Sequence, residues 1–357
     1  MKLAITSDEH LGKTLYRTED DSLNKFERKL YNVWKENIDI IIKEKPDFYI
    51  SCGDSFDIPN PKVIPIMKYK EQMARLKENS IPSLLIMGNH DFNFKNKQNE
   101  ASVLNMLIPD LLVSKYAEYE VDYYIKDNFL FVLAPFIYSK DNHLVWERVN
   151  EICEENKELH KVLITHGITE LYLEKFPMLE SEYMIVPTKT VELFNEVLIG
   201  HIHVPYVEKY KNTTIISPGA LINYAEPNDE TGPLFLEYND KDELVNIRRE
   251  HIDTPHTIKI TCNSDNINDI LDSVSENIYK IYYQGDTDSI DNVKFTEARN
   301  RAINLVLEVE KFDKEEDLVV AKQENIKDFM SWIGENYKDK LDDFQNAKES
   351  IYNYKGE

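Results

Sequence analysis

Seven side chains of the types that bind divalent metal ions are spread over the first 203 residues of the chain. They mix imidazole nitrogens with carboxylate and amide oxygens: Asp8, His10, Asp54, Asn89, His166, His201 and His203. Such a mixture suits manganese, iron or zinc better than calcium, which prefers oxygen throughout, or a zinc site built from thiolates. Seven ligands can hold two metals if one carboxylate bridges them. Because two metals about 3.5 to 4 Å apart can bind a phosphate ester and activate the attacking water, the set predicts a two-metal phosphoesterase site.

A further histidine directly follows one of these ligands. Because His90 is adjacent to Asn89, its ring cannot easily face the same metal, although it lies beside the site. We therefore interpret His90 as a general acid or transition-state stabiliser that faces the leaving oxygen. Asp91 is expected to orient His90 or to support its charge. The remaining four histidines lack this context, and we expect them on the surface or in a second domain: His143, His160, His251 and His256.

Short apolar runs lead directly to these candidate residues. Five such runs predict strands: Leu3–Ile5, Phe48–Ile50, Ser83–Met87, Val162–Ile164 and Val197–Ile199. Between them, patterns with three- and four-residue steps predict helices, at Phe26–Ile41 and Met67–Leu76. Sites of open α/β sheets form at the carboxyl ends of strands, where a glycine beside the ligand allows a sharp turn. An α/β layered core that ends near residue 220 is therefore expected to position the ligands.

The rest of the chain predicts additional modules. A strand pattern at Leu234–Tyr238 completes the catalytic sheet, so the first domain is expected to span residues 1–254. Residues 255–325 alternate strand patterns with predicted helices at Asn266–Asn277 and Phe295–Val306, which indicates a small α/β domain. Residues 326–357 carry apolar side chains at helical steps. These amphipathic helices either pack on their own domain or dock on a partner helix.

The composition narrows the class of protein. A net charge of -23 argues against a stand-alone DNA-binding protein, because nonspecific DNA affinity comes mainly from Lys and Arg. It argues less against an enzyme that meets phosphate through bound cations or borrows a basic surface from a partner. The three cysteines form no CxxC pair, and neither a signal peptide nor an apolar run of membrane-spanning length is present in this sequence. We expect a soluble cytoplasmic protein that does not associate with membranes.

Five sequence blocks resemble those of the calcineurin-like metallophosphoesterases, in the same order. They are Ser7–Gly12, Gly53–Asp57, Gly88–Asp91, Thr165–Gly167 and Gly200–His203. The Asp-x-His-Leu-Gly opening, the Gly-Asp-x-Phe-Asp block and the long C-terminus further resemble the SbcD nuclease family, the catalytic subunits of double-strand-break repair complexes. The resemblance implies an α/β calcineurin-like layered sandwich. It also implies that residues 255–325 form a capping domain that helps to position DNA.

The same resemblance implies roles for single residues. One metal would be held by Asp8, His10, Asp54 and His203, and the other by Asp54, Asn89, His166 and His201. The bridge would be Asp54, the catalytic histidine His90, and the activating metal manganese, Mn(II). Asp57 stands where some branches of the family carry a histidine that helps to orient the catalytic one. The C-terminal helices would dock on the coiled-coil root of an SbcC-like ATPase, and a homodimer is expected because the family forms one.

These patterns favour a manganese-dependent DNA exonuclease and endonuclease subunit that acts in DNA repair or recombination. A metallophosphatase or small-nucleotide phosphodiesterase with the same dimetal site is the main alternative, which the acidity of the chain favours. A non-catalytic scaffold that holds an ATPase is a second alternative. The intact ligand set argues against the scaffold, because a scaffold has no need of His90.

Overall fold

A computed structural model describes residues 1–15, 25–91, 112–113, 121–137, 142–175, 184–222 and 230–310. The chain divides into two compact units. The first contains Met1–Lys259 together with Val274–Lys280 and Thr296–Val306, and the second contains Ile260–Ser273 and Ile281–Phe295. Two six-stranded sheets lie in the first unit.

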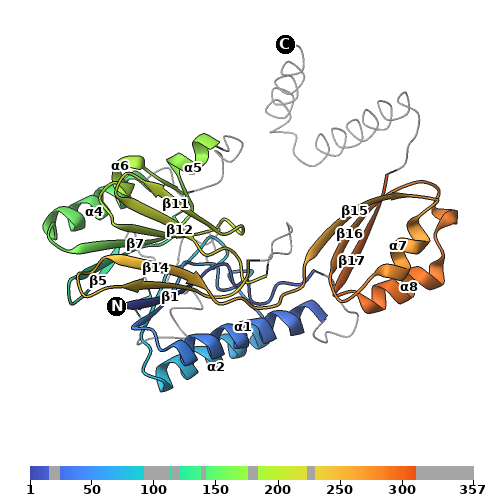
Figure 1. Ribbon diagram of the computed structural model, residues 1–357, viewed down its shortest axis with the longest axis horizontal. Coiled ribbons are helices and arrows are strands. Elements are labelled where there is room, and N and C mark those ends of the chain that lie inside the picture. The colour runs from blue at the N-terminus through green and yellow to red at the C-terminus, as the bar shows by residue number, and fades with distance from the viewer. Residues whose placement is uncertain are drawn as a thin grey trace, which may run out of the picture. The chain divides into compact units, whose positions relative to one another are not determined.

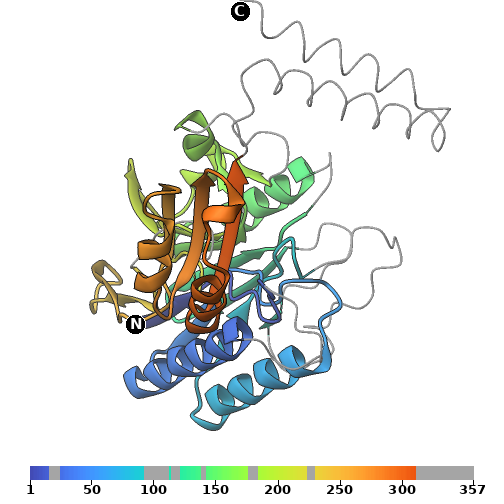
Figure 2. The same cartoon turned by 90° about the vertical axis from the view of Figure 1, so that its right-hand side faces the viewer.

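One sheet contains the predicted N-terminal strands. Its order is β14 (Leu244–Arg249), β13 (Leu234–Tyr238), β1 (Lys2–Thr6), β2 (Phe48–Ser51), β3 (Ser83–Leu85) and β4 (Leu112–Val113). The last four strands are parallel, and β13 is antiparallel to both of its neighbours. Helix α1 (Lys25–Glu44) follows β1 along the chain, and α2 (Val63–Glu78) follows β2. These two helices lie side by side on the same face of the sheet (Figures 1 and 2).

The other sheet carries the later ligands. Its order is β11 (Tyr206–Tyr210), β12 (Thr213–Ser217), β10 (Glu196–Gly200), β7 (His160–His166), β6 (Phe129–Ala134) and β5 (Asp122–Lys126). The four inner strands are parallel and the two edge strands antiparallel. Its other elements are α4 (Asn142–Glu155), α5 (Glu170–Lys175), α6 (Thr188–Val191) and the short parallel pair β8 (Ile168–Thr169) and β9 (Ile185–Val186). Figure 1 shows α4 and α6 on the side of this sheet that faces away from α1.

Alternation of side chains along the strands builds three apolar layers. Leu3 and Ile5 of β1 pack with Ile164 of β7 in the cluster between the sheets. Ala4 points the other way, into the cluster that contains residues of α1 and α2. Leu163 belongs to the cluster that contains residues of α4. Both faces of each central strand are therefore buried, which explains why the strands are apolar throughout, and the predicted α/β layered sandwich is confirmed.

A small three-stranded sheet follows the sandwich in the sequence. Its order is β15 (Thr257–Asn263), β16 (Ile278–Gln284) and β17 (Asn304–Glu310), with the helices α7 (Ile267–Ser273) and α8 (Asn292–Arg301) between its strands. Both helices lie along one face of it (Figure 1). The predicted helix at Phe295–Val306 is wrong at its end, because α8 ends at Arg301. From Asn304 the chain alternates instead, with Leu305 buried and Val306 exposed, as a strand requires.

Some expectations fall outside the described residues. The predicted helices at 326–357 are among them, and the domain limits at residues 254 and 325 stay predictions. Of the helices that the structure describes, none is both long and apolar enough to span a membrane.

One histidine that was expected on the surface or in the second domain lies in the sandwich. His160 begins β7, its side chain is only 11% exposed, and its Nε2 lies 2.6 Å from Oε2 of Glu196. Its ring packs against Phe129, with 4.5 Å between the ring centroids. The surface prediction for His160 is therefore wrong: the pair with the buried Glu196 compensates its polarity inside the protein.

Candidate active site

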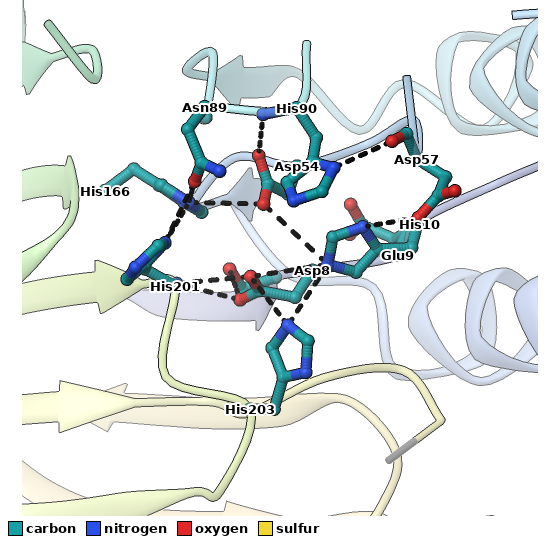
Figure 3. A network of polar contacts seen from close by, with 12 residues as sticks. Asp8, Glu9, His10, Asp54, Asp57, Asn89, His90, His166, His201 and His203 are labelled. Atoms are coloured by element: carbon teal, nitrogen blue, oxygen red, sulfur yellow. Dashed lines mark hydrogen bonds and ion pairs between the residues drawn. The ribbon is translucent and has the colours of Figure 1, made fainter. Parts of the chain in front are cut away.

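The strands that precede the predicted ligands end at one edge of the sandwich. In one sheet β1, β2 and β3 are parallel, and in the other β7 and β10 are parallel, so their carboxyl ends meet. His166 is the last residue of β7 and pairs in register with Gly200, the last residue of β10. Figure 3 shows the side chains that converge there: Asp8, His10, Asp54, Asn89, His90, His166, His201 and His203.

Three overlapping groups of side chains could each hold a metal ion. They are Asp8–His10–His203, His10–Asp54–His90 and Asp54–His166–His201, and in each group the ligand atoms lie within 4.8 Å of one another. His10 and Asp54 each occur in two groups. The shared Asp54 lies between the two sides of the cluster, where a bridging carboxylate would have to be.

On one side, hydrogen bonds determine which imidazole nitrogen is left for a metal. Nδ1 of His166 lies 2.7 Å from the carbonyl oxygen of Cys52, so this nitrogen carries a proton and donates it. Nε2 of His166 faces Oδ1 of Asn89 at 3.0 Å and Oδ2 of Asp54 at 3.4 Å. Nδ1 of His201 lies 2.9 Å from the same Asn89 oxygen. These atoms converge as the ligands of one ion would.

The other side is built in the same way. Nε2 of His10 lies 3.1 Å from Nε2 of His203 and 3.7 Å from Oδ2 of Asp54. Asp8 Oδ1 lies 3.7 Å from Nε2 of His203. Nδ1 of His10 faces the Asp57 carboxylate at 3.5 Å, which leaves Nε2 to face the centre. A carboxylate behind a metal-binding imidazole fixes the orientation of its ring.

Four of the candidate ligands have left-handed backbones. The φ angles are 53° at Asp8, 45° at His10, 56° at Asp54 and 96° at His201. Such conformations cost on the order of 1 to 3 kcal/mol each for residues other than glycine and persist only where the surroundings enforce them. Backbone hydrogen bonds of 2.9 Å from Asp8 N to Gly53 O and from His10 N to Asp54 O supply part of that constraint.

Gly200 allows the two sheets to approach each other at the site. A Cβ atom there would overlap Oγ of Ser7 and the carbonyl oxygen of Cys52. Its neighbour His201 donates its backbone N–H to the Asp8 carboxylate at 3.0 Å. Ser7 Oγ donates to the same carboxylate at 2.5 Å. The Asp8 carboxylate is thus held by both sheets.

His90 contacts the loop after β2 through both its backbone and its ring. Its backbone N–H donates to Oδ1 of Asp54 at 2.8 Å, and its ring Nδ1 lies 2.7 Å from the carbonyl oxygen of Asp57. A carbonyl can only accept, so Nδ1 carries the proton and Nε2 is the nitrogen left to face a substrate. The ring meets that of His10 edge to face, with 4.7 Å between centroids.

Asp91 is buried and contacts the backbone of two loops. Its carboxylate accepts N–H groups from Ser55 at 3.2 Å, Phe56 at 2.9 Å and Gly88 at 3.0 Å. Burial, with the charge of Asp54, raises the pKa of Asp91 to about 7. These bonds hold the loop after β2 against the loop after β3. An effect of Asp91 on His90 would therefore act through the position of these loops.

The charges of the cluster fit divalent cations. Asp8 and Asp54 are almost fully buried, and each carboxylate lies within 4.0 Å of two imidazole nitrogens. Burial lowers the pKa of His166, but the charge of Asp54 outweighs it and raises that pKa to about 9. Burial and the charge of His166 lower the pKa of His201 to about 3. Buried carboxylates among imidazoles are what a dimetal site requires, because a bound ion displaces the proton and neutralises the anions.

Three contributors behind the ligands were not predicted as site residues. Asp57 faces His10, the Cys52 carbonyl faces His166, and Glu9 lies buried between two ligands, where burial raises its pKa to about 7. Glu9 could have been predicted from the sequence, because it is a charged residue between two candidate ligands that follow an apolar strand. The role of the Cys52 carbonyl could not have been predicted, because every residue has a carbonyl group.

The sequence is similar to those of proteins named for DNA double-strand break repair. Over 207 residues the chain is 29% identical to the DNA double-strand break repair protein Mre11 of Methanococcus maripaludis, covering 57% of this chain and 52% of that protein. It is 23% identical over 366 residues to the protein of the same name from Nanoarchaeum equitans, covering 94% and 92%. The match therefore spans about half the length of the Methanococcus protein. These relatives confirm the expected resemblance to double-strand-break repair proteins.

A family profile also matches more than half of the chain. A dimetal phosphatase from Danio rerio matches with a TM-score of 0.41 and 12% identity, over 66% of this chain and 91% of that one. The profile described as calcineurin-like phosphoesterase matches residues 1–229, which include every candidate ligand. With these ligands at one edge of a layered sandwich, the chain belongs to the calcineurin-like phosphoesterase family.

Proposed function

We propose that this chain is a manganese-dependent DNA nuclease subunit that hydrolyses phosphodiester bonds with two metal ions. One observation carries the proposal: two sets of ligands meet at Asp54, and His90 stands beside them with Nδ1 bonded to a carbonyl. Mixed nitrogen and oxygen ligands suit manganese. The relatives named as DNA double-strand break repair proteins favour DNA as the substrate.

In this proposal, seven residues would hold the two metal ions and His90 would act on the leaving group. Asp8, His10, Asp54 and His203 would hold one ion, and Asp54, Asn89, His166 and His201 the other. When bound, two such ions would supply positive charge to the phosphodiester and would activate a water molecule for in-line attack. His90 would present Nε2 to the leaving sugar oxygen, while the Asp57 carbonyl accepts the Nδ1 proton and keeps the ring in place. With a second proton on Nε2, the ring would donate that proton to the sugar oxygen as its bond to phosphorus breaks.

The proposal is tested by following DNA cleavage with and without manganese. End-labelled linear duplex DNA, single-stranded DNA and a chromogenic phosphodiester are incubated with the wild-type chain, first alone and then with a coiled-coil ATPase of the repair type. We expect Mn²⁺-dependent degradation of DNA that stops when the metal is chelated. DNA that stays intact in both conditions would overturn the nuclease function.

A phosphatase or small-nucleotide phosphodiesterase remains the second candidate. The net charge of -23 favours it, because an acidic surface repels the DNA backbone. Hydrolysis of the chromogenic diester or of a small nucleotide, with DNA untouched even beside the ATPase, would support this function. The two-metal mechanism would then stand with a different substrate.

We propose that residues 326–357 dock on the coiled coil of an SbcC-like ATPase. Their helical apolar pattern fits a groove between partner helices. Deletion of residues 326–357 is expected to abolish co-purification with the ATPase but to leave Mn²⁺-dependent cleavage of the chromogenic diester unchanged. A truncated chain that loses its cooperative thermal transition would show that the segment packs on its own domain instead.

A homodimer is proposed to form through apolar side chains that are exposed around the start of α2. These side chains, termed the α2 patch, are Ile58, Val63, Ile64 and Met67, and their exposed fractions are 48%, 69%, 42% and 63%. A chain with Val63→Glu and Met67→Glu is expected to have the mass of a monomer in light scattering, because charges oppose burial of the patch. Val245→Glu, at a valine of β14 that is 60% exposed, is the matched control. Dimers that persist in the double variant would exclude this patch.

A further inference from the structure

A buried carboxylate that is neither a proposed metal ligand nor a proposed catalytic group lies behind the cluster of candidate ligands. Glu9 is 1% exposed and stands between the candidate ligands Asp8 and His10. Figure 3 shows it beside His10, at the rear of the cluster. An apolar side chain would fill a buried position at lower cost, because a buried carboxylate must be compensated by hydrogen bonds. The presence of a carboxylate therefore calls for an explanation beyond packing.

Hydroxyl groups from two neighbouring strands compensate Glu9. Thr6 Oγ1 of β1 donates to Oε1 at 2.5 Å. From β2, Ser51 Oγ donates to Oε2 at 3.2 Å and the Tyr49 hydroxyl donates to Oε1 at 3.3 Å. Thr6 and Ser51 are direct partners in the register of the two strands. The Glu9 carboxylate thus ties the loop after β1 to both strands, in the layer that contains Tyr49.

The loop held in this way is strained on both sides of Glu9. Asp8 has a φ angle of 53° and His10 one of 45°, and without restraint either residue would relax to a more common conformation. Relaxation would move the Asp8 carboxylate and the His10 imidazole away from His203. Their backbone N–H groups are bonded to the loop after β2. Glu9 is the side chain that anchors the loop from behind.

We propose that Glu9 is a positioning residue for the metal ion that Asp8, His10 and His203 would hold. The inference rests on the proposed function only in that a metal binds there. Its consequence is selective: loss of the anchor weakens the ion on the Asp8 side, while His166, His201 and Asn89 keep the other.

The test measures Mn²⁺ binding to the metal-stripped full chain by calorimetry, without substrate. In Glu9→Ala we expect one ion to bind as in wild type and the second to bind about 10- to 100-fold more weakly, as for other groups that support a metal ligand. In electron paramagnetic resonance, the coupled dimanganese signal should give way to that of isolated Mn²⁺. Glu9→Gln keeps the shape and one acceptor oxygen, and it should restore most of the affinity.

Glu196→Ala is the matched control. Glu196 is also a buried carboxylate, 3% exposed, and it is bonded to His160. It is the first residue of β10, whereas the ligands His201 and His203 follow the last residue of that strand. Its loss should lower the melting temperature and leave both ions bound as in wild type. Wild-type affinity for both ions in Glu9→Ala would overturn the proposal. So would an equal loss of affinity in Glu196→Ala, because stability alone would then explain the effect.

Ser51→Ala serves if Glu9→Ala does not fold. It removes one donor to Glu9, contains no change at a ligand, and should weaken the same ion by a smaller factor. Unchanged affinity for this ion in Ser51→Ala would then show that Glu9 is needed only for folding, which would overturn its positioning role. A wild-type chain that binds two ions yet leaves DNA intact would overturn the DNA substrate and leave the role of Glu9 standing.

Discussion

Replacement of His90 by alanine is expected to reduce DNA cleavage by about 10²- to 10⁴-fold, the usual contribution of a general acid. Both metal ions should bind with unchanged affinity, because the proposed set of metal ligands is complete without His90. Cleavage rates at saturating Mn²⁺ and binding isotherms of the same preparations measure the two effects separately. His143→Ala, which removes an exposed histidine of α4, is the matched control.

The position of His90 permits a sharper version of this experiment. His90 also belongs to a possible metal group with His10 and Asp54. Loss of a metal ion in His90→Ala would therefore show that His90 is a metal ligand rather than a catalytic residue. If His90 protonates the leaving oxygen, bis-p-nitrophenyl phosphate should be much less sensitive to His90→Ala, because its leaving group needs no proton. An equal loss on both substrates would favour stabilisation of the transition-state charge.

Asp54→Asn is expected to destroy the dinuclear centre. Asp54 is shared by groups on both sides of the cluster, and its carboxylate faces His10 at 3.7 Å and His166 at 3.4 Å. An amide has the same shape but lacks the negative charge and can place only one oxygen between two ions. Hydrolysis should fall to the level of the metal-free protein, and elemental analysis after dialysis should find fewer than two ions per chain.

The backbone around Asp54 should survive this substitution. The side-chain amide oxygen of the variant can still accept the backbone N–H of His90, which the Asp54 carboxylate binds at 2.8 Å in the wild type. The control is Glu196→Gln, an equivalent change at a buried carboxylate that contacts His160 instead of the ligands. Two retained ions together with wild-type cleavage in Asp54→Asn would exclude Asp54 as the bridge.

The strands and helices could be predicted where a short stretch of sequence carries a clear apolar pattern. The strands before Asp8, Asp54 and Asn89 end in polar residues and glycine, and apolar periodicity marks α1 clearly. The segment after Arg301 was misjudged because a short apolar run fits both the helical and the strand period until neighbouring elements decide between them. Helix α2 begins at Val63, before the predicted start at Met67, because Pro65 is tolerated in the first turn of a helix, where its missing N–H is not needed.

For the site, the sequence predicts the metal ligands from their residue types and their positions after strands, but it does not predict the residues that contact those ligands from behind. The ligand types and their place after strands were readable from the sequence, because carboxyl ends of parallel strands must meet. The partners behind the ligands were not. That Asp57 faces His10 with its carboxylate and His90 with its carbonyl depends on the left-handed turns at Asp54 and His10, which bring these loops together.

The division of the ligands between the two sheets links metal supply to folding. Asp8, His10, Asp54 and Asn89 follow strands of one sheet, whereas His166, His201 and His203 come from the other. An ion held from both sheets binds only the native protein, so it adds about 2.7 kcal/mol to the free energy of unfolding when its free concentration is about 100 times Kd. The lifetime of the protein in a cell would then vary with the free concentration of the ion on which its catalysis depends.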